Sequence, residues 1–304
     1  MSTSDPRIQE FRDIANQSLR GKPEVIDLAL CCLFAGGHLL IEDRPGVGKT
    51  TLVKLLARLS GLEMNRIQCT NDLLPGDILG GNIIQPGTGS FIFQKGPVFS
   101  QILIADELNR ASPRSQSACL QAMEEKEVSV DGVTYSLPDP FLVVATQNPQ
   151  ESIGTFPLPE SQFDRFLMRL EMGYPDRSAE REILERGESF NTPEGLPAIF
   201  KADDILEIQK KVRLVHMEAS LLDYIQDLVA VSRQAGPGMS TRAALDLVRA
   251  ARAKAYLSGR NYCLPDDIKS VFKPVTGHRS GFFPGNTEEA DRATGKILEQ
   301  VSTP

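Results

Sequence analysis

Tryptophan is absent from this 304-residue sequence, and its aromatic side chains are limited to 14 phenylalanines and 5 tyrosines. Stacking platforms for single-stranded nucleic acids are built from aromatic side chains, so the composition offers few residues for one. Basic residues are in the minority, with 33 Lys and Arg against 40 Asp and Glu and a formal charge of −7. This balance leaves a local basic channel open but argues against a broad basic face, so we expect no nucleic-acid partner.

Cysteine and histidine are too few and too scattered to suggest a disulfide framework or a zinc site. The three histidines lie far apart, and the odd set of five cysteines contains no CxxC pair (Cys31, Cys32, Cys69, Cys119 and Cys263). A reducing, cytoplasmic setting is the simplest expectation, and the polar start MSTSDPRIQEFRD has no signal-peptide pattern. The most apolar stretch, Leu28–Ile41, has 14 residues. A membrane span needs roughly 20, so we expect a buried helix and strand there and no membrane span.

Short apolar runs typical of strands alternate with helical patterns over the first 175 residues. This alternation predicts an α/β fold, a parallel sheet flanked by helices on both faces. After the break at Gly173-Tyr174-Pro175-Asp176 helical spacing dominates, so we expect an α/β domain over residues 1–175, a linker over 176–200 and a small all-α domain over 201–304. The candidate strands are 38–42, 64–69, 101–106, 141–146 and 166–172, and the later candidate helices are 203–215, 218–235, 240–258 (with Ser240 as N-cap), 265–272 and 287–301.

The segment Asp43-Arg44-Pro45-Gly46-Val47-Gly48-Lys49-Thr50-Thr51 follows a candidate strand and opens a candidate helix. This is the context of a phosphate-binding loop, in which glycines let successive backbone N–H groups face phosphate oxygens at a helix N-terminus. In such a loop Lys49 reaches the β- and γ-phosphates and the Thr50 hydroxyl ligates Mg²⁺. Asp43 departs from the general pattern, which has glycine there. The alternative is an ordinary strand-to-helix turn with a fortuitous GKT.

Two further candidate strands end in polar residues that suit nucleotide chemistry. The run QILIAD leads into Asp106-Glu107, which places one carboxylate to hold Mg²⁺ and the next to polarise an attacking water. The run FLVVAT is followed by Asn148, which could orient that water, although alone it could equally be a turn-forming Asn before Pro. Together with the phosphate-binding loop, the acidic pair predicts nucleoside triphosphate binding and hydrolysis.

These segments together resemble the AAA+ ATPases, and more narrowly the MoxR family, from about residue 15 to residue 300. The resemblance is carried by AGGHLLIED-RPGVGKT, FIFQKGPVF, ILIADELNRASPRSQSACLQAMEE, VVATQNPQESIGTFPLPESQFDRFLMRL and GMSTRAALDLVRAARA. It implies an AAA+ P-loop NTPase sheet followed by a small all-α lid domain. Loops with Asp at the position of Asp43 are familiar in that family.

The resemblance also implies roles for matching residues. Lys49 and Thr50 match Walker A, Asp106 and Glu107 match Walker B, Asn148 matches sensor 1, Arg165 matches the arginine finger and Arg242 matches sensor 2. The cofactors implied are ATP, held by Pro45–Thr51, and Mg²⁺, held by Thr50 and Asp106. Gly21 and Tyr174 are candidates for the adenine pocket.

The family further implies a ring, expected to be a hexamer, that works with a von Willebrand factor A-domain partner and remodels, matures or inserts a metal cofactor into a client protein. Two hairpin inserts, near 80–96 and 127–137, face the pore or the substrate in AAA+ relatives, while the alternative is a stabilising surface role. Two other functions stay open: a DNA-linked AAA+ motor and a nucleotide-dependent scaffold that does not hydrolyse.

Overall fold

The computed structural model describes residues 5–87, 89–148, 154–186, 193–234, 238–279 and 287–304. Its central element is a five-stranded parallel sheet in the order β2-β5-β8-β1-β9. The strands are β1 (Leu39–Glu42), β2 (Met64–Gln68), β5 (Ile102–Asp106), β8 (Leu142–Gln147) and β9 (Met168–Leu170). All five candidate strands are therefore confirmed, and the parallel α/β architecture with them.

The central strands are apolar along their length because both faces of the sheet are covered. Alternate residues of β5 divide between two hydrophobic clusters: Ile102 and Ile104 face one, and Leu103 and Ala105 face the other. The first cluster lies under α1 (Pro6–Ser18), α2 (Pro23–Phe34) and α3 (Lys49–Ser60), and the second lies under α5 (Pro113–Glu125). The sheet is thus a rigid platform that fixes where each strand ends.

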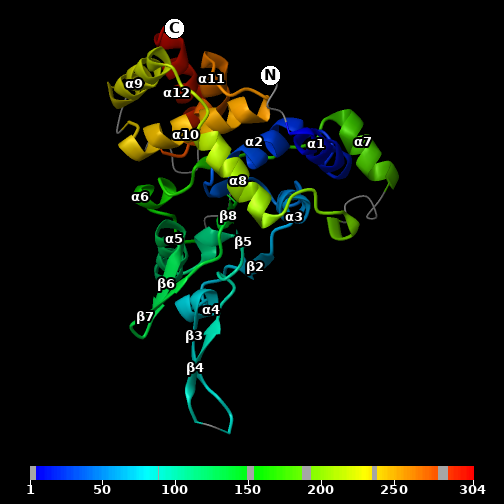
Figure 1. Ribbon diagram of the computed structural model, residues 1–304, viewed down its shortest axis with the longest axis vertical. Helices are drawn as coiled ribbons and strands as arrows, with labels where there is room; N and C mark the ends of the chain where they lie inside the picture. The colour runs from blue at the N-terminus through cyan, green and yellow to red at the C-terminus, as the bar shows by residue number, and fades with distance from the viewer. Residues whose placement is uncertain (1–4, 88, 149–153, 187–192, 235–237, 280–286) are drawn as a thin grey trace.

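A helical region follows the sheet and packs onto the α1–α3 layer (Figure 1). Its helices are α8 (Ala202–Arg213), α9 (Ala219–Gln234), α10 (Thr241–Leu257), α11 (Pro265–Thr276) and α12 (Thr287–Gln300). Ser240 caps α10 as expected, since its hydroxyl accepts the N–H of Ala243 at 3.0 Å. Phe34 of α2 packs against Phe200 and Tyr256, with ring centroids 6.0 and 6.3 Å apart. One apolar cluster therefore runs continuously from the α/β layer into the lid.

Residues 176–200, expected as a linker, contain a helix, α7 (Arg177–Arg186), and a short 3₁₀ turn, η3 (Pro193–Gly195). Two more short helical elements flank residues of interest, η1 (Leu108–Arg110) and α6 (Glu160–Phe163). Among the described helices, none is long and apolar enough to cross a membrane.

Two hairpins project from the sheet on the side away from the lid (Figure 1). One follows the short helix α4 (Pro75–Leu79) and pairs β3 (Gly80–Ile84) with β4 (Phe91–Lys95); the other pairs β6 (Glu127–Val130) with β7 (Val133–Ser136). The two are joined side by side: Asn82 donates to Asp131 at 2.6 Å, and the rings of Phe93 and Tyr135 stack at 4.1 Å. They therefore form one projecting unit.

Candidate functional site

A cavity of about 490 Å³ opens where β1, β5 and β8 end. In a parallel sheet this edge is where ligands bind, because the strand-to-helix loops meet there. The cavity brings together nearly all residues that the sequence assigns to phosphate and metal. Its lining consists of Pro45, Gly46, Gly48, Lys49, Thr50, Thr51, Arg66, Gln68, Asp106, Glu107, Thr146 and Asn148. Val47 of the same loop is buried instead in the hydrophobic cluster, where it anchors the loop.

The loop before α3 has the backbone that phosphate binding requires. Gly46 and Gly48 have φ values of 84° and 95°, which only glycine adopts without strain. Gly48 immediately precedes α3, so the helix begins at the cavity, where the backbone N–H groups of its first turn have no partner within the helix. The Lys49 ammonium donates to the carbonyl of Asp43, which places the cation within the loop.

Asp43 occupies a position at which the general phosphate-loop pattern has glycine, and its side chain accepts two backbone hydrogen bonds. One carboxylate oxygen accepts the N–H of Arg44 at 2.7 Å, and the other accepts the N–H of Gly173 at 2.6 Å. These bonds tie the phosphate loop to the segment that follows β9. The departure at Asp43 thus adds a tether between two walls of the site.

Asp106, at the end of β5, is held on both carboxylate oxygens. Oδ1 accepts from the Thr146 hydroxyl at 3.1 Å, and Oδ2 pairs with Nε of Arg66 at 2.5 Å. The Thr146 oxygen also accepts the N–H of Glu107 at 3.0 Å, so one hydroxyl fixes both acidic residues. Thr146, on the neighbouring strand β8, therefore fixes the positions of both Asp106 and Glu107.

Glu107 has a left-handed backbone, with φ 56° and ψ 49°, which is strained for a residue with a side chain. Its carboxylate accepts from Nε2 of Gln68 at 3.0 Å and from Nη1 of Arg110 at 3.2 Å. Gln68 lies opposite Asp106 in the parallel pairing of β2 with β5. The carboxylate is therefore held among polar groups at the mouth of the cavity.

Sequence reasoning missed Arg66, Gln68 and Thr146. Each lies on a strand that the sequence marks mainly by its apolar residues, and only the pairing of strands places its side chain at the site. Once β2 is placed beside β5, alternation brings the side chains of Arg66 and Gln68 to the edge that carries Asp106 and Glu107.

The donor set fits Mg²⁺ bound together with a nucleotide. Mg²⁺ is usually held by one or two carboxylates plus substrate phosphates and water, and Thr50 and Asp106 supply such oxygen ligands in one cavity. Among the described residues, no group of three or more His, Cys, Asp or Glu side chains could hold a metal unaided. The cavity is thus suited to a metal that arrives with its phosphates.

Arg165 and Arg242 do not line this cavity. They lie together on a second pocket, of about 240 Å³, between the sheet and the N-terminal end of α10. Both pair with the same carboxylate at the end of α5: Arg165 reaches Glu124 at 2.7 Å and Arg242 reaches it at 2.5 Å. The two expected phosphate-sensing arginines therefore form one group, apart from the loop that would bind phosphate.

The candidate adenine residues lie beside the phosphate loop. Lys22 donates to the carbonyl of Tyr174 at 2.6 Å, and desolvation lowers the pKa of the Lys22 amine. Gly21 has φ 71°, and a Cβ there would approach Ala179 to 3.0 Å. Tyr174 is 68% exposed. The segments 19–22 and 172–179 are thus brought together next to the loop.

The parallel sheet, the phosphate loop and the helical lid define a P-loop protein of the AAA class. Residues 38–168 match the ATPase family associated with various cellular activities (AAA), and residues 230–301 match the AAA lid domain. A crystal structure of a protein from Cytophaga hutchinsonii superimposes with a TM-score of 0.87 at 37% identity, covering 98% of this chain and 95% of that one.

Two relatives narrow the assignment. The chain is 42% identical to YeaC of Bacillus subtilis over 94% of this chain and 91% of that one. It is 40% identical to the chaperone MoxR1 of Mycobacterium tuberculosis over 85% and 71%, respectively. This chain therefore belongs to the MoxR family of AAA+ ATPases.

Proposed function

We propose that this protein hydrolyses ATP with Mg²⁺ in the cavity at the N-terminal end of α3. The observation that carries the proposal is the convergence of Lys49, Thr50, Asp106, Glu107 and Asn148 on one cavity. Lys49 and the N–H groups of the loop hold the phosphates, and Thr50 and Asp106 hold Mg²⁺, which neutralises charge on the β- and γ-phosphates. Glu107 polarises the attacking water, and Asn148 orients it.

We further propose that the site is completed by a second copy of the chain. Transfer of the γ-phosphoryl group needs positive charge beyond Lys49, and an arginine delivered by a neighbour supplies it in many such enzymes. Arg165 and Arg242 suit this purpose because they lie together on a separate pocket, where the two cations share one carboxylate, Glu124. Hydrolysis then depends on assembly into a ring, which we expect to be a hexamer.

Hydrolysis in such a ring would drive work on another protein. A relative with 40% identity is named a chaperone, which supports work on a client protein. We further propose that this work is remodelling, maturation or metal-cofactor insertion, with a von Willebrand factor A-domain protein as partner. The joined hairpins give the ring a surface for that contact. Five free cysteines, all buried, agree with a cytoplasmic setting.

The test uses two variants and their mixture. Glu107→Gln should keep ATP binding and lose turnover, since the amide cannot polarise water. Arg165→Ala should also bind ATP and lose turnover, by about 10³-fold or more. In a mixture, Arg165 of the Glu107→Gln copy meets an intact pocket on the Arg165→Ala copy, so activity should return. Full turnover by Glu107→Gln, or a mixture that stays inactive, contradicts the proposal.

A further inference from the structure

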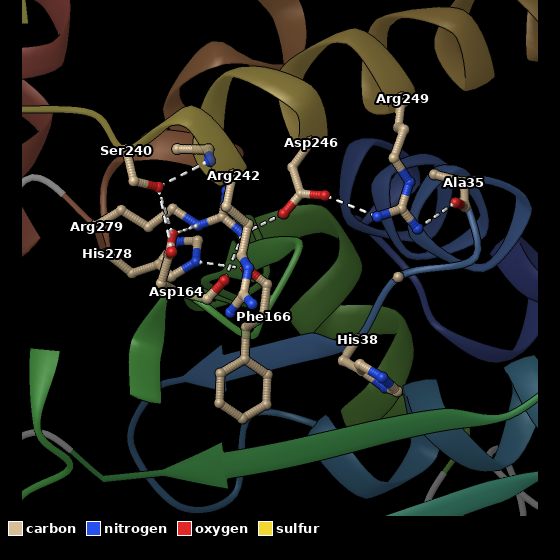
Figure 2. Close-up of polar contacts among 12 residues, drawn as sticks. Ala35, His38, Asp164, Phe166, Ser240, Arg242, Asp246, Arg249, His278 and Arg279 are labelled. Atoms are coloured by element: carbon tan, nitrogen blue, oxygen red, sulfur yellow. Dashed lines mark hydrogen bonds and ion pairs between the residues drawn. The ribbon is translucent and has the colours of Figure 1, made fainter. Parts of the chain in front are cut away.

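A buried arginine at the C-terminal side of α11 connects the lid to the sheet (Figure 2). The side chain of Arg279 is 1% exposed. Its Nη2 donates to the carboxylate of Asp246 at 2.6 Å, to the carbonyl of Phe166 at 2.6 Å and to the carbonyl of Asp164 at 3.2 Å. Its Nε lies 3.5 Å from the carboxylate of Asp164. One guanidinium therefore joins the turn after α6 to the helix α10.

Each partner of Arg279 adjoins one of the two arginines of the second pocket. Asp164 and Phe166 flank Arg165 in the chain, so their carbonyls fix the backbone on both sides of it. Asp246 lies one helical turn after Arg242 on α10. The arrangement therefore couples two arginines that are 77 positions apart in the sequence.

A second tie reinforces the first. The hydroxyl of Ser240, the N-cap of α10, donates to the two carboxylate oxygens of Asp164 at 3.1 and 3.2 Å. His278 adds a contact from its Nε2 to the carbonyl of Phe166 at 2.9 Å. The start of α10, which carries Arg242, is thus fastened directly to the turn that carries Arg165.

The chemistry of this contact calls for arginine. A guanidinium holds its nitrogens at fixed positions in one plane, so that Nε faces Asp164 while Nη2 faces Asp246, an arrangement that the single ammonium of a lysine does not reproduce. A buried cation is tolerated when its charge is paired, and here the carboxylates of Asp164 and Asp246 supply the pairing. All three hydrogen bonds come from Nη2, while Nε and Nη1 are buried without a hydrogen-bond partner among the described residues. The geometry is therefore that of a clamp, and the contact is too buried to act as a surface ion pair.

We propose that Arg279 is a positioning residue that locks the turn of residues 164–166 to the start of α10, so that Arg165 and Arg242 reach a neighbouring copy's nucleotide as one rigid pair. This inference rests on the proposed function. Arg279 does not line the cavity of the phosphate loop. Its loss therefore acts on the neighbour's site and leaves the nucleotide cavity of its own copy intact.

The kinetic test compares Arg279→Gln with Arg260→Gln. The control removes an arginine from another ion pair in the lid, between Arg260 and Asp267 at 2.6 Å, which has no contact with residues 164–166. Arg279→Gln should lower kcat by about 100-fold, the effect of misplacing a group by an ångström, with the KM for ATP changed less than about twofold. The control should keep the wild-type kcat.

Mixing separates positioning from misfolding. Copies carrying Arg279→Gln keep their own Glu107, so added Glu107→Gln copies, whose Arg279 is intact, should restore turnover, as we expect them to do for Arg165→Ala. A folding defect or a defect in the variant's own cavity gives no such rescue. Failure of the rescue overturns the proposal.

A distance measurement tests the clamp without activity. Spin labels at Glu160→Cys on α6 and Leu245→Cys on α10 report the two parts that Arg279 joins, and the five native cysteines are buried. Arg279→Gln should broaden the distance distribution, and Arg260→Gln should not. An unchanged distribution overturns the proposal. If Arg279→Gln fails to fold, Asp164→Asn replaces it in both assays with the same expectations.

The two failures are distinguishable. If the wild-type chain shows no ATP turnover at any protein concentration, the proposed function fails, and the spin-label distances alone decide whether Arg279 is a clamp. If the wild type turns over and the Arg165→Ala mixture regains activity but the Arg279→Gln mixture does not, the clamp fails and the proposed function stands.

Discussion

The backbone at Glu107 offers a direct measure of how much stability the site gives up. Glu107 is one of three described residues other than glycine with a positive φ. A side chain in this left-handed region costs roughly 1–2 kcal/mol, because Cβ comes close to the following carbonyl oxygen. The strand β5 would otherwise continue straight past the cavity, and the left-handed turn ends it at the acidic pair.

The perturbation is a pair of substitutions, Glu107→Gly and Glu107→Ala. Both remove the carboxylate and its contacts with Gln68 and Arg110, so they differ only in the Cβ. Glycine recovers roughly 1–2 kcal/mol of strain and loses roughly 0.5–1 kcal/mol to the greater freedom of the unfolded chain. Glu107→Gly should therefore be more stable than Glu107→Ala by about 1 kcal/mol, or about 2 °C in Tm.

The assay is urea unfolding followed by circular dichroism, since the chain has no tryptophan for fluorescence. The control is the same pair at Gln68, which lies in a strand: there alanine should be the more stable by roughly 0.5–1 kcal/mol. The reasoning is refuted if alanine is as stable as glycine at residue 107, or if both sites show the same sign. Neither Glu107 variant should hydrolyse ATP, so a gain in stability would accompany a loss of function.

Three further predictions concern the loop and the buried histidines. Lys49→Ala should weaken ATP binding by about 10- to 100-fold, the range for one hydrogen bond to a charged group, in a titration with a fluorescent nucleotide. Asp43→Ala cuts the tether to Gly173 and should weaken binding in that titration by about fivefold, or about 1 kcal/mol, because the carboxylate is only partly buried. Burial lowers the pKa of His38 to about 4 from 6.5. As pH falls, His38 therefore binds a proton in the unfolded chain before it does so in the folded one. The free energy of unfolding should drop by about 2 kcal/mol between pH 7.5 and pH 5, measured by urea unfolding at each pH. The pKa of His278 is lowered in the same direction, so a flat pH profile would contradict both.

The strands and the phosphate loop could be predicted from sequence because their signals are local. A buried strand in a covered parallel sheet is a continuous apolar run, and the loop's glycines and Lys49 lie within a few residues of each other. The carboxyl ends of parallel strands share one edge, so Asp106 and Asn148 had to meet near the loop. The cavity thus follows from local patterns plus one rule of topology.

Arg66 and Arg279 could not be found that way. Arg66 becomes a partner of Asp106 only through the pairing of β2 with β5, and a single sequence does not specify strand order. Arg279 follows a helix in a stretch with no periodic pattern, and its partners lie 33 to 115 positions away. The position of such a residue depends on contacts between distant parts of the chain, which local sequence patterns do not reveal.

Long-range packing also places the lid, and it separates the charged residues of the chain into two pockets. Within the cavity, Lys49 and Arg66 are matched by Asp106 and Glu107, so the lining is close to neutral. Bound ATP brings more negative charge than one Mg²⁺ cancels, and developing charge on the γ-phosphate adds to it. In the second pocket, Arg165 and Arg242 share a single carboxylate, Glu124, so this group of three side chains carries a net positive charge. In the proposed ring, a chain with a net charge of −7 would bind a polyanion because the cations that it needs are concentrated on two surfaces that a second copy would bring together.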